Sequence, residues 1–262
     1  MKEPIVPNYL PAAAFTFTPK DGGEPVTVYR PYEAMPFDEL EKHAAENERG
    51  ALLQLGERYC YGKLGTEQDD EKGYQYLLKA AELGVQDAEA LIAAYYINGI
   101  LMEPDPEKCQ EWLLSAANHG SWNAMEKLAT FYRTGTAGFT ADHEQAYEWA
   151  LQMERMVRMY WSYYTQKGFV GFNEKLRELL AAHTRAAFFL ADCFADGIGT
   201  KRDLDAAITC INRGEAFVCS VTGLAKVEMF QNRRSQLVQR KQNDERRRRN
   251  AERAAKAKKK KK

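Results

Sequence analysis

Histidine and cysteine are the side chains that metal binding or nucleophilic catalysis would use first in this chain. They are His43, His119, His143, His183, Cys60, Cys109, Cys193, Cys210 and Cys219. His143-Glu144 is not followed by a second histidine one turn later, as a zinc-protease helix requires, and the sequence has no CxxC pair. It also lacks a phosphate-binding loop, a GxSxG elbow and a dinucleotide fingerprint. We therefore expect no enzyme, with no catalytic residue, no metal site and no cofactor.

The cysteines are odd in number and lie mostly within apolar helical patterns, which favours buried free thiols in a reducing compartment. The N-terminal residues combine Lys2 with Glu3 and are interrupted by prolines, unlike a secretory signal. No apolar run approaches the roughly 20 residues needed to span a bilayer. We expect a cytoplasmic protein.

Charge is divided unevenly along the 262 residues, although the formal net charge is zero. Residues 233–262 contain 15 Lys or Arg and 3 Asp or Glu, a net charge of +12, so the remaining residues carry −12. Because 45% of the residues are apolar, most of the chain can build a core. The sequence predicts an acidic folded body with a basic C-terminal tail.

An internal repeat sets the framework for these residues. Four segments fit the pattern A-x-x-x-[LI]-[GA]-x-x-[YF]-x-x-G, namely 51–62, 88–99, 124–135 and 186–197. The first three pattern positions lie on one stripe of a helix, and the last glycine suits a left-handed helix end. Each segment is followed by an aspartate suited to cap a second helix: Asp69, Asp105, Asp142 and Asp203. Each unit is therefore predicted to be a helical hairpin, and stacked hairpins would share one core.

The units resemble Sel-one-like repeats, which are relatives of the tetratricopeptide repeat. The resemblance rests on the pattern above and on LLKAAELG (77–84), WLLSAANHG (112–120) and GIGTKRDLDAA (197–207). It implies an all-α fold, an alpha-alpha superhelix that binds other proteins. The loop 100–105 lacks the second glycine of the family pattern, the loop 136–142 lacks it in register, and Cys210 replaces an aromatic residue.

The predicted organisation has four parts. An N-terminal extension (1–36) contains a small β-hairpin around Asp21-Gly22-Gly23, which we expect to cap the solenoid. The solenoid (37–217) has units near 51–84, 88–120, 124–153 and 186–217, with an aromatic insertion at 154–183. A capping helix (218–239) and a basic tail (240–262), helical or disordered, complete the chain.

The insertion is open to two interpretations. It is either an atypical helical pair whose aromatic residues fill the core, or a partner-binding surface, since aromatic clusters anchor interfaces. The candidates for partner contact are Tyr160, Trp161 and Tyr164.

The predicted function is a non-catalytic scaffold or adaptor that holds a partner segment in a concave groove lined by the first helices. The candidate groove residues are Glu57, Tyr61, Asn98, Glu126, Thr130, Arg133 and Asp192. An immunity or regulatory protein that masks its partner is a form of the same hypothesis.

Two alternatives remain. One is a nucleic-acid- or ribosome-associated protein that uses Arg240–Lys262, which could also bind an anionic surface or fold onto the acidic body. The less favoured is a β-lactamase-like hydrolase, described for a cysteine-rich branch of the family whose regularly paired cysteines are missing here.

Overall fold

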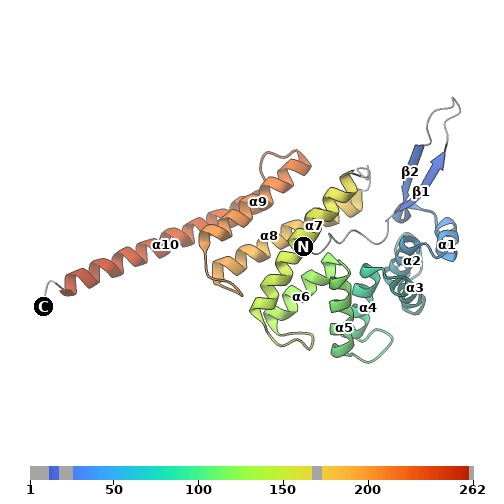
Figure 1. The fold of residues 1–262 in the computed structure, drawn as a ribbon, viewed down its shortest axis with the longest axis horizontal. Coiled ribbons are helices and arrows are strands. Elements are labelled where there is room, and N and C mark those ends of the chain that lie inside the picture. The colour runs from blue at the N-terminus through green and yellow to red at the C-terminus, as the bar shows by residue number, and fades with distance from the viewer. Residues whose placement is uncertain (1–11, 18–25, 167–172, 260–262) are drawn as a thin grey trace.

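The structure is a computed structural model that describes residues 12–17, 26–166 and 173–259. Its described helices follow one another as a row of stacked hairpins, from which the last helix projects (Figure 1). The helices are α1 (Phe37–Ala45), α2 (Arg49–Tyr61), α3 (Asp70–Glu82), α4 (Gln86–Asn98), α5 (Pro106–Asn118), α6 (Trp122–Thr134), α7 (His143–Gln166), α8 (Asn173–Asp196), α9 (Leu204–Thr222) and α10 (Glu228–Lys259). None of them is both long and apolar enough to cross a membrane.

The predicted helix ends are confirmed. The first helices α2, α4 and α6 end at glycines with φ of 60°, 65° and 66°, a conformation that costs a glycine little. The carboxylates of Asp69, Asp105 and Asp203 accept hydrogen bonds from backbone N–H groups in the first turns of α3, α5 and α9. Asp142 does the same for α7, through the N–H groups of Glu144 and Gln145. Local sequence signals therefore set where each hairpin turns.

The repeated small residues allow the two helices of a hairpin to pack closely. A Cβ atom added to Gly73 on α3 would lie 2.6 Å from Sγ of Cys60 and 3.1 Å from its backbone nitrogen on α2. One on Gly56 would lie 2.7 Å from Cδ2 of Leu77. The aliphatic pattern residues Leu55, Ile92 and Leu128 are fully buried beside these contacts.

The first helices form the more closely spaced layer of the stack. Consecutive first helices contact one another, in the pairs α2–α4, α4–α6 and α6–α8. Consecutive second helices make fewer such contacts within the described residues. Because the more closely spaced layer of a bent stack lies on its inner side, we expect the first helices to line the concave side.

The N-terminal end is fastened to α2. Strands β1 (Ala12–Phe17) and β2 (Val26–Pro31) pair antiparallel, and their predicted turn lies outside the described residues. The strands are followed by the 3-10 turn η1 (Tyr32–Ala34). The buried guanidinium of Arg58 on α2 donates hydrogen bonds to three carbonyl oxygens in and just after this turn, at distances of 3.3, 3.1 and 2.7 Å. Those oxygens belong to Tyr32, Glu33 and Met35. The role of the strands as a cap stays a prediction.

The described residues of the insertion are helical, and they continue the neighbouring helices rather than forming helices of their own. The helices α7 and α8 have 24 residues each, whereas α6 has 13, and the insertion therefore lengthens both in line. The predicted glycine-containing turn at 167–171 lies outside the described residues.

The C-terminal helix α10 takes the place of a fifth first helix. It packs on α9 as α4 packs on α3, with Phe230 and Leu237 buried. Its exposed face carries uncharged polar residues such as Asn232, Ser235 and Gln239, which suits the end of a repeat array. The predicted division at residue 239 is not a break in structure, because one helix runs through it to Lys259.

Candidate partner-binding surface

The predicted groove residues all lie on first helices. Those of the first two units, which we call the open half, are exposed or half-buried, whereas most of those farther along contact α8 or α10. Tyr61 on α2 is 55% exposed, and Nζ of Lys63 lies 5.0 Å from its ring centroid. Asn98 at the end of α4 is exposed and donates its Nδ2 hydrogen bond to the carbonyl of Ala94, at 2.9 Å. Glu57 is half-buried, with Oε2 3.5 Å from Nε2 of Gln54. These three form the open half, in the first two units.

The candidates on α6 instead link the third and fourth units. Arg185 on α8 donates two hydrogen bonds to the carboxylate of Glu126, at 2.5 and 2.8 Å. The guanidinium of Arg133 lies 4.5 Å from the ring centroid of Phe189, also on α8. Thr130 donates its hydroxyl hydrogen bond to the carbonyl of Glu126, at 3.0 Å. The contacts of Glu126 and Arg133 therefore serve the stacking of the repeats, whereas the Thr130 bond stays within α6.

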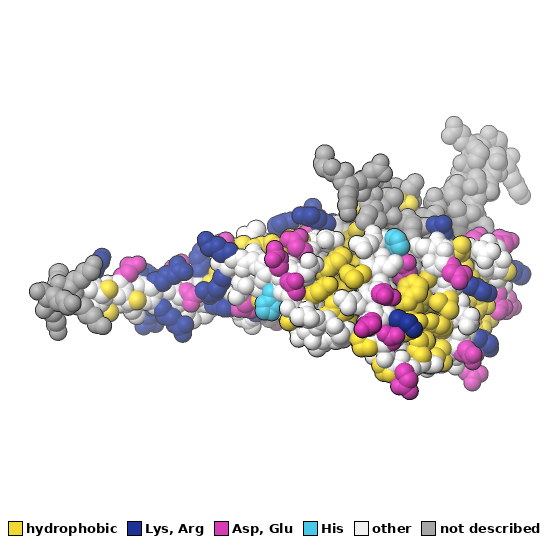
Figure 2. All heavy atoms as spheres, turned by 60° about the horizontal axis from the view of Figure 1, so that its bottom comes forward, with side chains coloured by type: hydrophobic (Ala, Val, Ile, Leu, Met, Phe, Trp, Pro, Cys, Tyr) yellow, Lys and Arg dark blue, Asp and Glu magenta, His cyan; other side chains and the backbone are white. Residues whose placement is uncertain are grey.

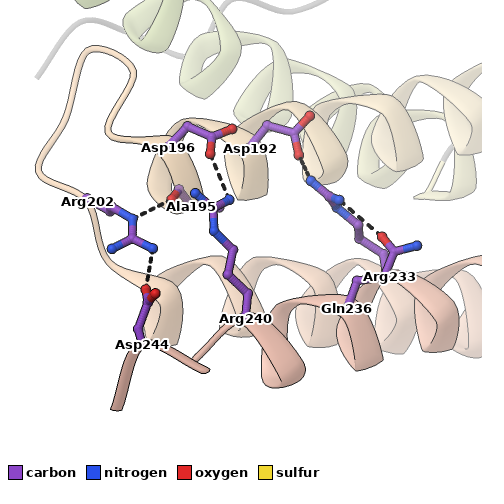
Figure 3. Close-up of polar contacts among 8 residues, drawn as sticks. All are labelled: Asp192, Ala195, Asp196, Arg202, Arg233, Gln236, Arg240 and Asp244. Atoms are coloured by element: carbon purple, nitrogen blue, oxygen red, sulfur yellow. Dashed lines mark hydrogen bonds and ion pairs between the residues drawn. The ribbon is translucent and has the colours of Figure 1, made fainter. Parts of the chain in front are cut away.

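The last candidate, Asp192, is covered by α10 (Figure 3). Its carboxylate accepts a hydrogen bond from Arg233, and Asp196 one turn later accepts one from Arg240, at 2.7 Å. The loop residue Arg202 reaches the other way, to the carboxylate of Asp244 on α10 at 2.5 Å. The proximal part of the basic helix is thus held by acidic residues of the fourth unit.

Two exposed leucines lie in the loops that directly follow α2 and α4, and the sequence analysis did not select them. Leu64 is 71% exposed and Leu101 is 52% exposed, at the same loop position of consecutive units. Both have left-handed backbones, with φ of 55° and 64°. The signal was available in part, because the loop at 100–105 departs from the family's second glycine. Apolar side chains gather on the face of the repeat body that Figure 2 brings forward.

The aromatic insertion divides between the two interpretations. Tyr160 is 3% exposed; its hydroxyl accepts a hydrogen bond from Nε2 of Gln86 at 2.7 Å and donates one to the carbonyl of Gly120 at 3.2 Å. It belongs to the core, so its selection as a partner-contacting residue is corrected. Trp161 is half-buried, edge-on to the ring of Phe217 at 5.5 Å. The side chain of Tyr164 lies outside the described residues.

A cluster of possible metal ligands and the five cysteines have side chains with chemical potential. The ligand atoms of His43, Glu46 and Glu48 lie within 4.8 Å of one another, but Glu48 already accepts the hydroxyl hydrogen bond of Tyr32. The five cysteines are free thiols. Burial raises the pKa of the Cys193 thiol to about 12, which keeps it protonated at neutral pH.

Stacked helical hairpins with first helices on the inner side define an α-solenoid repeat protein. The chain belongs to the Sel1 repeat family: the model described as Sel1 repeat matches residues 50–85, 86–121, 122–154 and 184–213. The insertion falls between the third and fourth matched units. The Sel1 fold is generally a scaffold for protein–protein interaction.

Several solved structures are similar to this chain, and the first of them shows the same fold. A Sel1 repeat protein from Oxalobacter formigenes is 23% identical with a TM-score of 0.54, over 69% of this chain and 63% of that one. A protective antigen from uropathogenic Escherichia coli is 22% identical (TM-score 0.42), over 68% of this chain and 40% of that one. A putative Sel1 repeat protein from Klebsiella pneumoniae is 18% identical (TM-score 0.39), over 78% of this chain and all of that one. This chain thus spans less than two thirds of the first two proteins. No curated protein matches it significantly.

Proposed function

We propose that this protein is a non-catalytic scaffold that binds a segment of a protein partner on the open half of its concave surface. The observation that carries the proposal is the exposure of three large apolar side chains in the first two units, those of Tyr61, Leu64 and Leu101. Farther along the same surface, the candidate residues are already engaged by neighbouring helices or by α10. The partner therefore enters at the N-terminal units.

Leu64 and Leu101 lower the stability of the free protein. A left-handed conformation costs a residue with a Cβ atom about 1–2 kcal/mol, and exposed leucine gains nothing from burial. Covering one such side chain with a partner would contribute about 1.5–3 kcal/mol. Backbone strain combined with exposed apolar surface is typical of a binding site.

The polar neighbours indicate the chemistry of the bound segment. Glu57 and Asn98 lie on the same helices as the apolar residues or directly before their loops. An acidic and an amide side chain beside apolar anchors favour a segment that carries a basic residue together with an apolar one. Helical and extended segments both meet this requirement.

The test compares two triple variants in affinity purification from the native host. The first carries Tyr61→Ser, Leu64→Gly and Leu101→Gly. The control carries Leu224→Ser, Met229→Ser and Val238→Ser, which removes the large exposed apolar side chains at the C-terminal end of the described residues. We expect partners retained by the wild type and the control to be lost by the first variant. Retention of every partner by the first variant, with its helical content unchanged, would reject the proposal.

A further inference from the structure

A pocket of about 480 Å³ is lined by residues of α7, α8 and α9, the helices at the C-terminal end of the repeats. Its walls are the second helices α7 and α9, and α8 forms its floor. Both walls are longer than the 13 residues of α3 and α5, with 24 residues in α7 and 19 in α9. The insertion contributes Glu154, Arg155, Arg158 and His183 to the lining, and the volume is in the range of ligand-binding sites.

The rim of the pocket has an excess of positive charge. Arg155 and Arg158 on α7 and Arg213 on α9 line it, and all three are exposed. Glu154 is the one carboxylate among the lining residues, and its Oε1 lies 3.2 Å from Nη1 of Arg158 and 3.7 Å from Nη2 of Arg213. A single carboxylate oxygen shared by two guanidinium groups leaves several of their N–H donors for an incoming anion.

The interior of the pocket combines apolar surface with one buried polar ring. Leu190, Phe194 and Phe217 contribute apolar side chains. His183 is 3% exposed and stacks on Phe217 with ring centroids 4.0 Å apart. Its Nδ1 has no hydrogen-bond partner, and its Nε2 lies 3.9 Å from Oε1 of Glu154. Buried polar atoms without a hydrogen-bond partner are uncommon in folded proteins.

We propose that this arginine pocket binds an acidic segment of a second protein, in which one carboxylate lies beside one large apolar side chain. The carboxylate pairs with Arg158 and Arg213, and the apolar side chain packs against Phe194 and Phe217. Guanidinium groups bind carboxylates through paired hydrogen bonds, so the position of the two arginines selects an anion at the rim. This site is separate from the concave surface and gives the scaffold a second point of attachment.

The test uses fluorescein-labelled peptides with a neutral Gly-Ser body and measures fluorescence anisotropy with the full chain. One peptide carries an internal Leu-Phe-Glu and an amidated end; its controls carry Leu-Phe-Gln or Ala-Ala-Glu. A second pair ends in Leu-Phe, as a free carboxylate or as an amide.

We expect binding only where a carboxylate and the apolar Leu-Phe pair occur together. The two acidic peptides show whether the bound carboxylate can come from a side chain or from a chain terminus. Equal binding of neutral and acidic peptides, or no binding of either acidic peptide, would overturn the proposal. Tighter binding of a phosphoserine version would overturn the choice of a carboxylate.

Variants test whether the peptide binds at the arginine pocket and whether the effect comes from these two arginines rather than from the net charge of the protein. The double variant Arg158→Ala, Arg213→Ala should weaken binding about tenfold or more, since a hydrogen bond to a charged group contributes about 1.5–3 kcal/mol. Lys127→Ala with Lys201→Ala removes the same charge from exposed positions elsewhere and should leave affinity unchanged. Glu154→Gln should strengthen binding, by up to about fivefold, because it removes the competing carboxylate. Weaker binding to E154Q, or equal losses in the two double variants, would contradict the assignment.

Discussion

At the residue scale, one loop position of the repeat has a left-handed backbone in every unit but carries different side chains. The residue two places after each first-helix glycine has a positive φ in all four units, and it is Leu64, Leu101, Ala137 or Gly199. At Gly199 a Cβ atom would lie 1.9 Å from the carbonyl oxygen of His143, so glycine is required there. At Leu64 and Leu101 the side chains instead extend into solvent. The first two units therefore keep apolar side chains at positions where the backbone favours glycine.

Replacing Leu64 by glycine should stabilise the protein. Relief of the left-handed strain contributes about 1–2 kcal/mol, and the greater freedom of glycine in the unfolded chain subtracts about 0.5–1 kcal/mol. We expect the free energy of unfolding in urea to rise by about 0.5–1 kcal/mol. The control is Leu224→Gly, at a similarly exposed leucine without a positive φ, which should be neutral or destabilising. A loss of stability in L64G would show that the leucine contributes to folding.

The buried ring of His183 predicts a pH dependence of stability. Burial lowers the pKa of His183 from 6.5 to about 4, with Arg158 and Arg213 acting in the same direction and Glu154 opposing them. The folded state thus resists a proton that the unfolded chain takes up below pH about 6.5, so stability is full above that pH and is lost as the pH falls toward 4. The loss amounts to at most about 3 kcal/mol.

The matched variant is His183→Phe, which keeps an aromatic ring against Phe217 but cannot titrate. Unfolding curves at pH 7 and pH 4 should show the wild type losing more stability than this variant over the same interval. Parallel losses in the two proteins would mean that His183 is protonated in the folded state.

At the element scale, local signals predicted the hairpins and long-range contacts decided the rest. Glycine and aspartate at fixed spacing defined the helix ends, because both act on the nearest turn of backbone. The burial of Tyr160 depends on Gln86 and Gly120, which are 74 and 40 residues away in sequence. No local pattern reports such distances, so the sequence could not assign this tyrosine to the core. The in-line insertion was likewise open, because helical periodicity is the same in one long helix and in two short ones.

The two parts of α10 should differ in their contribution to stability. Phe230 is fully buried against α8 and α9, whereas the side chains from 245 to 256 are exposed. Deleting residues 246–262 should change the free energy of unfolding by less than about 0.5 kcal/mol. Phe230→Ala in the full chain should lower it by about 3–5 kcal/mol. A deletion that costs as much as the Phe230 variant would show that the distal helix packs on the body.

At the scale of the whole molecule, the zero net charge results from an acidic body and a basic helix that are partly joined. Lys241 lies 2.5 Å from the carboxylate of Asp205, next to the pairs that hold Arg233 and Arg240. Beyond Asp244 the basic side chains lie along the projecting helix (Figure 2). Binding of nucleic acid through Arg240–Lys262 stays a prediction, and it would depend on the residues after Asp244. The molecule thus has three separable regions: the open concave units, the arginine pocket and the distal basic helix.

The central claim is that a protein partner lies on the open half of the concave surface, and site-specific photo-crosslinking in the native host tests it directly. Benzoylphenylalanine would replace Tyr61 or Asn98 on the first helices, and Glu82 or Gln236 as exposed controls on α3 and α10. The account predicts a covalent adduct with the same partner from positions 61 and 98, and none from 82 or 236. Adducts from the control positions alone, or equal adducts from all four, would contradict it.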